Sequence, residues 1–298
     1  MDRKKALAWL IAAGLLAGCS GRPRPIRVGS KNFTEQLILG EIAAEHLENR
    51  LRAPVVRRLG LGGTLLAHQA LITGQIDLYP EYTGTALTNV LNLPADYEFG
   101  AVGERVRQEY ERRFLAVWMP PLGFTNGFAI AIRGADARAH NLASLSDAAA
   151  YQPGWRLGSG YEFIERPDGF NALMKAYSLP MNAPPRTMDL GLVYRALESN
   201  QVNMSAGSET DGMLSAIDVK VLADDKHAFP PYEAAFVVRE EALAAHPGLR
   251  EALAELSGKF KSKVMQNLNY QVDGKHVPIA EVAKGFLKQA GLGGGRAR

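Results

Sequence analysis

The chain alternates between strand patterns and helix patterns soon after residue 25, and this rhythm constrains its fold more than any other feature. Residues 26–29 and 55–56 predict two strands, and a third strand opens at Ile76. An amphipathic helix is predicted before the second strand, and another helix, over 65–73, before the third. Strands separated by helices are typical of a parallel sheet covered by helices. The sequence therefore predicts an α/β fold.

A second block with the same pattern follows, and the end of the chain is helical. Helices alternate there with strands predicted at 127–132, 155–158, 202–204, 219–222 and 234–239. Helices with Ala, Leu and Glu periodicity run from Glu240 to the C-terminus. Two such blocks in 298 residues predict two lobes with a cleft between them.

The first predicted helix begins beside a lysine. Asn32 and Glu35 have the spacing of a capping box, with Asn in place of the usual Ser or Thr, and Thr64 is predicted to cap the next helix. The apolar and acidic residues of the first helix lie on opposite sides, which predicts a surface helix packed on a sheet. Lys31 lies in the turn before it, where a ligand anion would meet an ammonium group and the positive end of a helix. The alternative for Lys31 is a solvated loop lysine.

The stretch 76–85 predicts a strand that ends abruptly. Pro80 has no backbone donor and favours an extended residue before it, so we expect the strand to stop there and residues 81–85 to turn away. Ligands bind at the ends of strands in α/β sheets. Tyr82 and Thr85 would then suit a molecule with a cationic, apolar part and a polar part. The alternative is an ordinary turn with tyrosines in the core and threonines capping a helix.

The net charge of +3 is concentrated at the N-terminus. Residues 1–24 hold five basic residues and one acidic residue, so the remainder of the chain is close to neutral. A nucleic-acid partner is therefore not expected, because no basic face remains to neutralise phosphates.

The N-terminus predicts export and lipidation. Three basic residues at 3–5 precede an uncharged apolar run over 6–18, which is shorter than the about 20 residues that a bilayer requires. Residues 16–19 resemble the lipobox of bacterial lipoproteins, and Cys19 is the single cysteine of the chain. We therefore expect a signal peptide over 1–18 and a lipidated tether over 19–25. A buried cysteine in a signal-anchor helix is the alternative.

The chain lacks common catalytic and metal-binding motifs. It has no G-x-S-x-G, no H-E-x-x-H and no Cys-x-x-Cys, and the glycines at 60–63 lack the spacing of a phosphate-binding loop. Its six histidines are scattered, away from carboxylates at metal-ligand spacing. An exported two-lobed protein of this kind is more simply a ligand-binding protein than an enzyme, and no metal or cofactor is expected.

Five motifs in order resemble one protein family. They are Gly29-Ser30-Lys31-Asn32-Phe33-Thr34-Glu35-Gln36, Leu78-Tyr79-Pro80-Glu81-Tyr82-Thr83-Gly84-Thr85, Glu162-Phe163-Ile164-Glu165-Arg166-Pro167-Asp168-Gly169, Thr210-Asp211-Gly212 and Phe229-Pro230-Pro231-Tyr232-Glu233. Together they resemble the substrate-binding lipoproteins of ABC transporters for glycine betaine, choline and related quaternary amines. The resemblance covers nearly all of the chain after residue 26.

The resemblance implies a type II periplasmic binding protein fold with two crossover strands. The lobes are then expected at 26–127 plus 233–298 and at 128–232. A monomer anchored at the outer face of a membrane, or in the periplasm, would deliver a quaternary amine to an ABC permease in the cytoplasmic membrane.

The resemblance also implies a ligand site. A trimethylammonium group has no hydrogen-bond donor and is held by aromatic faces through cation-π attraction. By position, Tyr82 and Tyr232 match walls of an aromatic cage, and Phe128 stands where a tyrosine is usual. The carboxylate of a betaine needs cations and donors. Its matching contacts are Lys31, Thr85 and Arg166, and Asp168 is expected to fix the loop that carries Arg166.

One departure from the family weakens the predicted cage. The family often has Tyr-Ser-Thr-Asp where this chain has Ser208-Glu209-Thr210-Asp211, so a hydroxyl replaces a cage wall. Similar departures occur in the low-affinity, stress-induced branch of the family. A receptor for an amino-acid-like or other polar solute that contacts Ser208 and Glu209 is an alternative, as are a two-lobed extracytoplasmic enzyme and a sensor protein.

Overall fold

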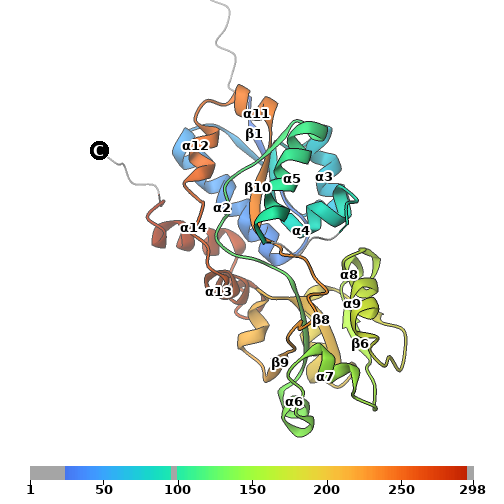
Figure 1. Cartoon of the computed structure of the whole chain (residues 1–298). Helices are drawn as coiled ribbons and strands as arrows, with labels where there is room; N and C mark the ends of the chain where they lie inside the picture. The colour runs from blue at the N-terminus through green and yellow to red at the C-terminus, as the bar shows by residue number, and fades with distance from the viewer. Residues whose placement is uncertain (1–23, 95–98, 294–298) are drawn as a thin grey trace, which may run out of the picture.

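The computed structural model describes residues 24–94 and 99–293, which form two α/β lobes, one above the other in Figure 1. The predicted signal peptide and Cys19 lie outside these residues. Within them, no helix has both the length and the apolar character needed to cross a bilayer.

The first lobe is built on a mixed five-stranded sheet. Its strand order is β2 (Val55–Arg58), β1 (Ile26–Gly29), β3 (Leu78–Tyr82), β10 (Ala234–Arg239) and β4 (Ala116–Trp118). β1 is parallel to β2 and β3, whereas β10 enters the sheet antiparallel to β3 and β4. β10 thus pairs with β3 although it begins about 150 residues later in the chain. The short strand β4 was not predicted.

Helices cover both faces of this sheet. The helices of the lobe are α2 (Thr34–Leu51), α3 (Thr64–Ile72), α4 (Thr83–Thr85), a π-helical turn over Ala86–Val90, α5 (Phe99–Phe114), α11 (Glu240–Ala245), α12 (Leu249–Ala254), α13 (Ser262–Asp273) and α14 (Ile279–Gln289). Apolar residues of α2 and of the C-terminal helices form one core cluster, and those of α3 and α5 form another. Because α12, α13 and α14 pack on α2, that helix is largely buried rather than a surface helix.

The second lobe has its own sheet. Its order is β7 (Arg186–Thr187), β6 (Leu157–Ser159), β8 (Met204–Ser208), β5 (Phe128–Arg133) and β9 (Val219–Val221). The helices are α6 (Gly134–His140), α7 (Leu145–Ala149), α8 (Tyr161–Glu165), α9 (Phe170–Tyr177), α10 (Leu190–Glu198) and a 3-10 turn, η2 (Gly212–Ser215).

Two segments connect the lobes side by side. Thr125 and Glu233 pair across an isolated antiparallel bridge, and the Asn126 N–H donates to the Tyr232 carbonyl at 3.0 Å. The predicted lobe limits at 128 and 233 fall at these segments, next to β5 and β10. The predicted two-lobed α/β fold is confirmed, whereas the assignment of lobes to those ranges stays a prediction.

The expectation that Pro80 ends its strand was wrong. β3 continues through Pro80 to Tyr82 and pairs with β10 along that length. Pro80 lies opposite Phe236, whose carbonyl instead accepts a hydrogen bond from the Met119 N–H on the far side of β10. Pro80 and Phe236 therefore form a non-hydrogen-bonded pair, and the missing N–H faces β1, whose pairing with β3 is confined to Leu78.

Two predicted helix caps were also wrong. α2 begins after Phe33 with no side-chain cap, and the Glu35 side chain turns into the interior rather than back toward Asn32. α3 begins at Thr64 itself, with Gly63 as its cap residue. A Cβ at Gly63 would lie 2.6 Å from side-chain oxygens of Tyr161 and Glu162 of the second lobe. The absence of a side chain there lets the two lobes approach each other.

Candidate binding cavity between the lobes

A cavity of about 310 Å³ lies where the two lobes face each other. All of the residues predicted to bind the ligand line it: Lys31, Tyr82, Thr85, Phe128, Arg166, Ser208 and Tyr232. Tyr82 comes from the end of β3, Phe128 from the start of β5 and Tyr232 from the segment that returns to the first lobe. Aromatic side chains from both lobes and an arginine therefore share one hollow.

Lys31 is a buried residue and not a solvated loop lysine, since its side chain is 1% exposed. Its ammonium group lies 2.5 Å from Glu81 Oε1 and 3.0 Å from Thr64 Oγ1. The Nζ atom is also 5.1 Å from the centre of the Tyr82 ring. The charge of Lys31 is thus compensated by a carboxylate of the same lobe, a pairing that was not predicted.

Arg166 forms the opposite end of the cavity together with Asp168. Its Nε and Nη2 atoms donate to the two Asp168 oxygens at 2.9 and 2.5 Å, and the Tyr232 hydroxyl donates to the same carboxylate at 2.7 Å. The guanidinium carbon lies 5.0 Å from the centre of Phe128 and 5.7 Å from that of Tyr232. Asp168 does not line the cavity and fixes Arg166, as expected.

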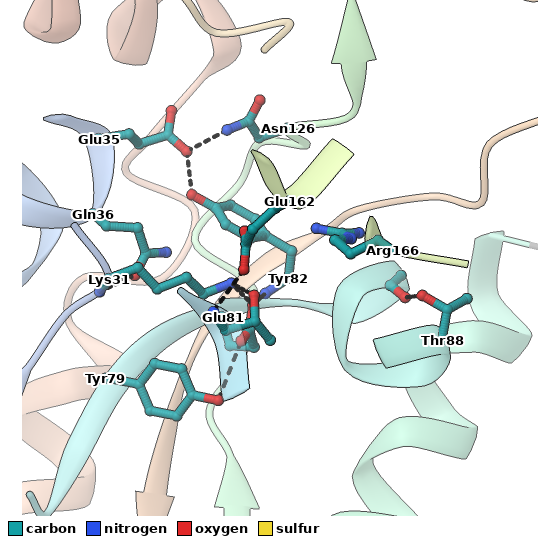
Figure 2. A network of polar contacts seen from close by, with 12 residues as sticks. Lys31, Glu35, Gln36, Tyr79, Glu81, Tyr82, Thr88, Asn126, Glu162 and Arg166 are labelled. Carbon is teal, nitrogen blue, oxygen red and sulfur yellow. Dashed lines mark hydrogen bonds and ion pairs between the residues drawn. The ribbon is translucent and has the colours of Figure 1, made fainter. Parts of the chain in front are cut away.

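Tyr82 is held through its hydroxyl by Glu35. The hydroxyl donates to Glu35 Oε1 at 2.5 Å, and Asn126 Nδ2 donates to the same oxygen at 2.8 Å, as Figure 2 shows. The Tyr82 ring stacks against Phe33, with ring centres 6.5 Å apart. Glu35, which sequence reasoning assigned to a helix cap, is instead a cavity residue.

Ser208, the departure from the family pattern, belongs to a network of hydroxyl and amide groups. It donates a hydrogen bond to Asn126 Oδ1 and lies 3.0 Å from Thr210 Oγ1, which in turn donates to Glu35. Glu209 lies outside the lining of this cavity and accepts a hydrogen bond from the Gly127 N–H at 3.0 Å. Ser208 thus occupies the cavity wall, whereas the suggested role of Glu209 as a ligand contact has no support in the lining.

Comparison with known proteins identifies the family. Residues 24–289 match the family described as the substrate binding domain of the ABC-type glycine betaine transport system. The chain belongs to this family. It is 37% identical over 285 residues to the ergothioneine transport permease/ergothioneine binding protein EgtU of Helicobacter pylori, covering 95% of this chain but only half the length of that protein.

Two further family members are similar along their whole length. The glycine-betaine-binding protein of Pseudomonas aeruginosa is 36% identical over 312 residues, which cover 99% of both chains. A solved structure described as a glycine betaine/carnitine/choline ABC transporter is 31% identical, covers 90% of this chain and 99% of its own, and superposes with a TM-score of 0.76.

In this member of the family, Glu162 joins the two lobes at the cavity. Its Oε1 accepts a hydrogen bond from the Thr64 N–H at 2.7 Å. Burial opposes ionisation of Glu162, but the charges of Lys31 and Arg166 and the Thr64 N–H hold its pKa below the ordinary value. Figure 2 shows Glu162 above the Lys31 ammonium group. Glu162 lies in one of the motifs that resemble the family, but the sequence alone did not predict a role for it.

The pKa values of Glu35 and of the acidic groups near it are raised rather than lowered. Burial raises the pKa of Glu35, although the donors around it oppose that rise. Burial also raises the pKa of Asp211 to about 7, helped by the charges of Asp273 and Glu35 and opposed by the Met213 N–H. The described residues contain no group of three or more histidines or carboxylates placed to hold a metal ion.

The side chains that line the cavity include more acidic than basic groups. The basic ones are Lys31, Arg166 and Arg195, and the acidic ones are Glu35, Glu162, Asp189, Asp211 and Asp273. An excess of carboxylates next to aromatic faces favours a ligand that brings a positive charge and little hydrogen-bonding capacity around it.

Proposed function

We propose that this chain is the extracytoplasmic solute-binding component of an ABC importer and that it holds a quaternary amine in the cavity between its lobes. The observation that carries the proposal is the shared lining: Tyr82, Phe128 and Tyr232 from different parts of the fold surround one hollow together with Arg166. The family of the chain, and relatives named for binding glycine betaine and ergothioneine, support the same class of ligand.

The ring faces suit the ammonium end of such a ligand. A trimethylammonium group cannot donate hydrogen bonds, so cation-π contacts of about 0.5–2 kcal/mol each hold it. Arg166 already stacks on one side of Phe128 and Tyr232. The Lys31 ammonium group lies 5.1 Å from the centre of the Tyr82 ring, which also stacks on Phe33. Each of the three rings thus already has a protein cation nearby, and in this proposal the ligand's ammonium group shares these walls.

The opposite end suits a carboxylate or another polar group. Asp168 engages Nε and Nη2 of Arg166, which leaves Nη1 to donate to a ligand oxygen. Thr85 and Lys31 line the same cavity and complete the predicted contacts. The function is binding and delivery without turnover, and the chain works as a monomer that hands its ligand to a membrane permease and is anchored by a lipid at Cys19.

Isothermal titration of the purified protein tests the ligand class. Glycine betaine, choline, carnitine and ergothioneine are titrated separately, and thermal shift is measured with each. Binding of at least one of these solutes is expected. No heat and no thermal shift with any of them would remove the quaternary-amine proposal and leave a receptor for another polar solute.

A further inference from the structure

Glu35 differs from Glu81, Glu162 and Asp168 because no cation neutralises it. Glu81 pairs with Lys31 and Asp168 pairs with Arg166, each at 2.5 Å. Glu162 lies in the field of both of those cations. Among the residues that the structure describes, Glu35 forms no ion pair, although it lines the cavity and is only 2% exposed.

Four neutral donors surround the Glu35 carboxylate instead. Oε1 accepts from the Tyr82 hydroxyl and Asn126 Nδ2. Oε2 accepts from Thr210 Oγ1 and from Asn269 Nδ2, the latter at 3.2 Å. The donors come from β3, α13, the lobe-connecting segment and the turn after β8, so both lobes contribute to this one group.

The arrangement of the two amides shows that the network is built for an anion. Asn126 accepts from Ser208 through Oδ1, and Asn269 donates to the Thr210 carbonyl at 2.9 Å through Nδ2. Each amide therefore turns its NH₂ group toward Glu35, and an NH₂ group cannot accept a hydrogen bond. Two of the four donors thus have no alternative to donating, and they favour the ionised carboxylate against the burial that raises the pKa of Glu35.

A buried anion without a cation is costly unless a positive charge comes from elsewhere. These neighbouring ionisable groups do not provide that positive charge. Asp211 before η2 and Asp273 at the end of α13 are acidic, and Lys31 is paired with Glu81. The open space beside Glu35 is the cavity itself. A cation in that cavity would meet the Tyr82 ring and, behind its hydroxyl, the Glu35 charge.

We propose that Glu35 is the counter-charge for the ammonium group of the ligand, acting through space and through the Tyr82 ring that it orients. This inference rests on the proposed function and deepens it, because it assigns the recognition of positive charge to a residue outside the aromatic cage. Glu35 selects a charged ammonium over an uncharged group of the same shape, whereas rings and shape alone discriminate between them less strongly.

The test compares a quaternary ammonium ligand with its uncharged carbon isostere on matched variants. Choline is paired with 3,3-dimethylbutan-1-ol, and glycine betaine with 3,3-dimethylbutanoate; titration calorimetry or competition gives Kd for each member. In Glu35→Gln the new amide nitrogen can face the Thr210 hydroxyl, which is able to accept. We expect this variant to bind the ammonium ligand about 10–100-fold more weakly and the isostere within about threefold of the wild type.

Two further variants keep the test decisive. Glu45→Gln removes a carboxylate from the same helix, where Glu45 lies 3.9 Å from Arg57, and should change neither affinity. Glu35→Asp keeps the charge with a shorter side chain and should retain most of the preference for the ammonium ligand even if both affinities fall.

The outcomes separate the two claims. If Glu35→Gln weakens ligand and isostere equally, or Glu35→Asp loses the preference as completely as Glu35→Gln, the counter-charge role is wrong while the proposed function stands. If the wild type binds no quaternary amine at all, the proposed function itself fails. A preference that disappears in Glu35→Gln and persists in Glu35→Asp and Glu45→Gln supports the inference.

Discussion

The pKa values of carboxylates are shifted in opposite directions at the two ends of the cavity. Around Arg166, burial opposes ionisation of Asp168 and Glu162, but nearby cations lower the pKa of both. Around Glu35, burial raises the pKa of Glu35, Asp211 and Asp273; neutral donors oppose the rise, and a positive charge, that of His276, opposes it at Asp273. The comparison teaches that burial alone does not decide the charge state of this site.

The same difference determines the orientation in which a zwitterionic ligand would bind. A carboxylate is favoured at the Arg166 end, where N–H groups remain, and an ammonium group is favoured at the Glu35 end, where an anion lacks a cation. A zwitterion with its charges at opposite ends would fit in one orientation. Substitutions at each end test this orientation separately.

The largest effect is expected from Arg166→Ala. Asp168 would be left buried with the hydroxyl groups of Tyr232 and Thr88 but no cation, and an unpaired buried charge costs about 3–5 kcal/mol of stability. Glycine betaine should lose more affinity than choline, because choline has no carboxylate. Thermal melts and titrations with both ligands measure the two effects.

The double variant Arg166→Ala with Asp168→Asn serves as the control for that prediction. Removing both charges should recover much of the stability without restoring glycine betaine binding. Equal losses for choline and glycine betaine in the single variant would show that Arg166 does not recognise the carboxylate.

The next effect concerns pH at the Glu35 end. The pKa of Asp211 is raised from its unfolded value to about 7, so its contribution to stability is full below about pH 4 and is lost as the pH rises toward 7. Asp211→Asn keeps an acceptor for the Met213 N–H at 2.9 Å and removes the charge. Since Asp211 is only half-buried, we expect a gain of about 1–3 kcal/mol at pH 8.

Denaturant unfolding of Asp211→Asn and wild type at pH 4 and pH 8 checks this. The difference between the two proteins should be small at pH 4 and should grow with pH. A constant difference across that range would mean that Asp211 does not titrate as its surroundings indicate.

How much of the site the sequence predicts depends on how local each role is. Lys31, Tyr82 and Arg166 lie in short motifs whose residue types carry the chemistry, and all three line the cavity. The role of Glu35 depends on donors at 126, 210 and 269, which no local pattern connects to it. Its spacing from Asn32 predicted a cap because that is the sole pattern visible within one turn of helix.

The same reasoning applies to the fold. β1 and β10 were predicted with the bounds that the structure shows, because their alternation is local. The continuation of β3 through Pro80 was not predicted, because it depends on which strand pairs with each edge of β3 and over which residues. Register between segments 150 residues apart is information that a single sequence does not display.

A smaller effect on affinity is expected at Tyr82. Tyr82→Ala removes a cage wall and should weaken both choline and glycine betaine by about 2–30-fold, the range of one cation-π contact. Tyr82→Phe keeps the ring and loses the hydrogen bond to Glu35 at 2.5 Å, so its loss should be smaller. Titration of both variants separates the ring from its hydroxyl. If the phenylalanine variant were as impaired as the alanine variant, the ring face would not be the group that holds the ligand.

The smallest effect is expected from Ser208→Tyr, which places an aromatic side chain where the family often has one. A new wall adds cation-π attraction but breaks the contacts of Ser208 with Asn126 and Thr210, and with them part of the support of Glu35. We expect quaternary amines to bind about threefold more tightly, well below the gain of a full wall. Ser208→Ala, which breaks the same contacts without adding a ring, measures the cost separately by titration. Because the cost falls on the Glu35 end, Ser208→Ala should weaken choline more than its uncharged isostere; an equal loss for both would mean that the hydroxyl network does not support the charge of Glu35.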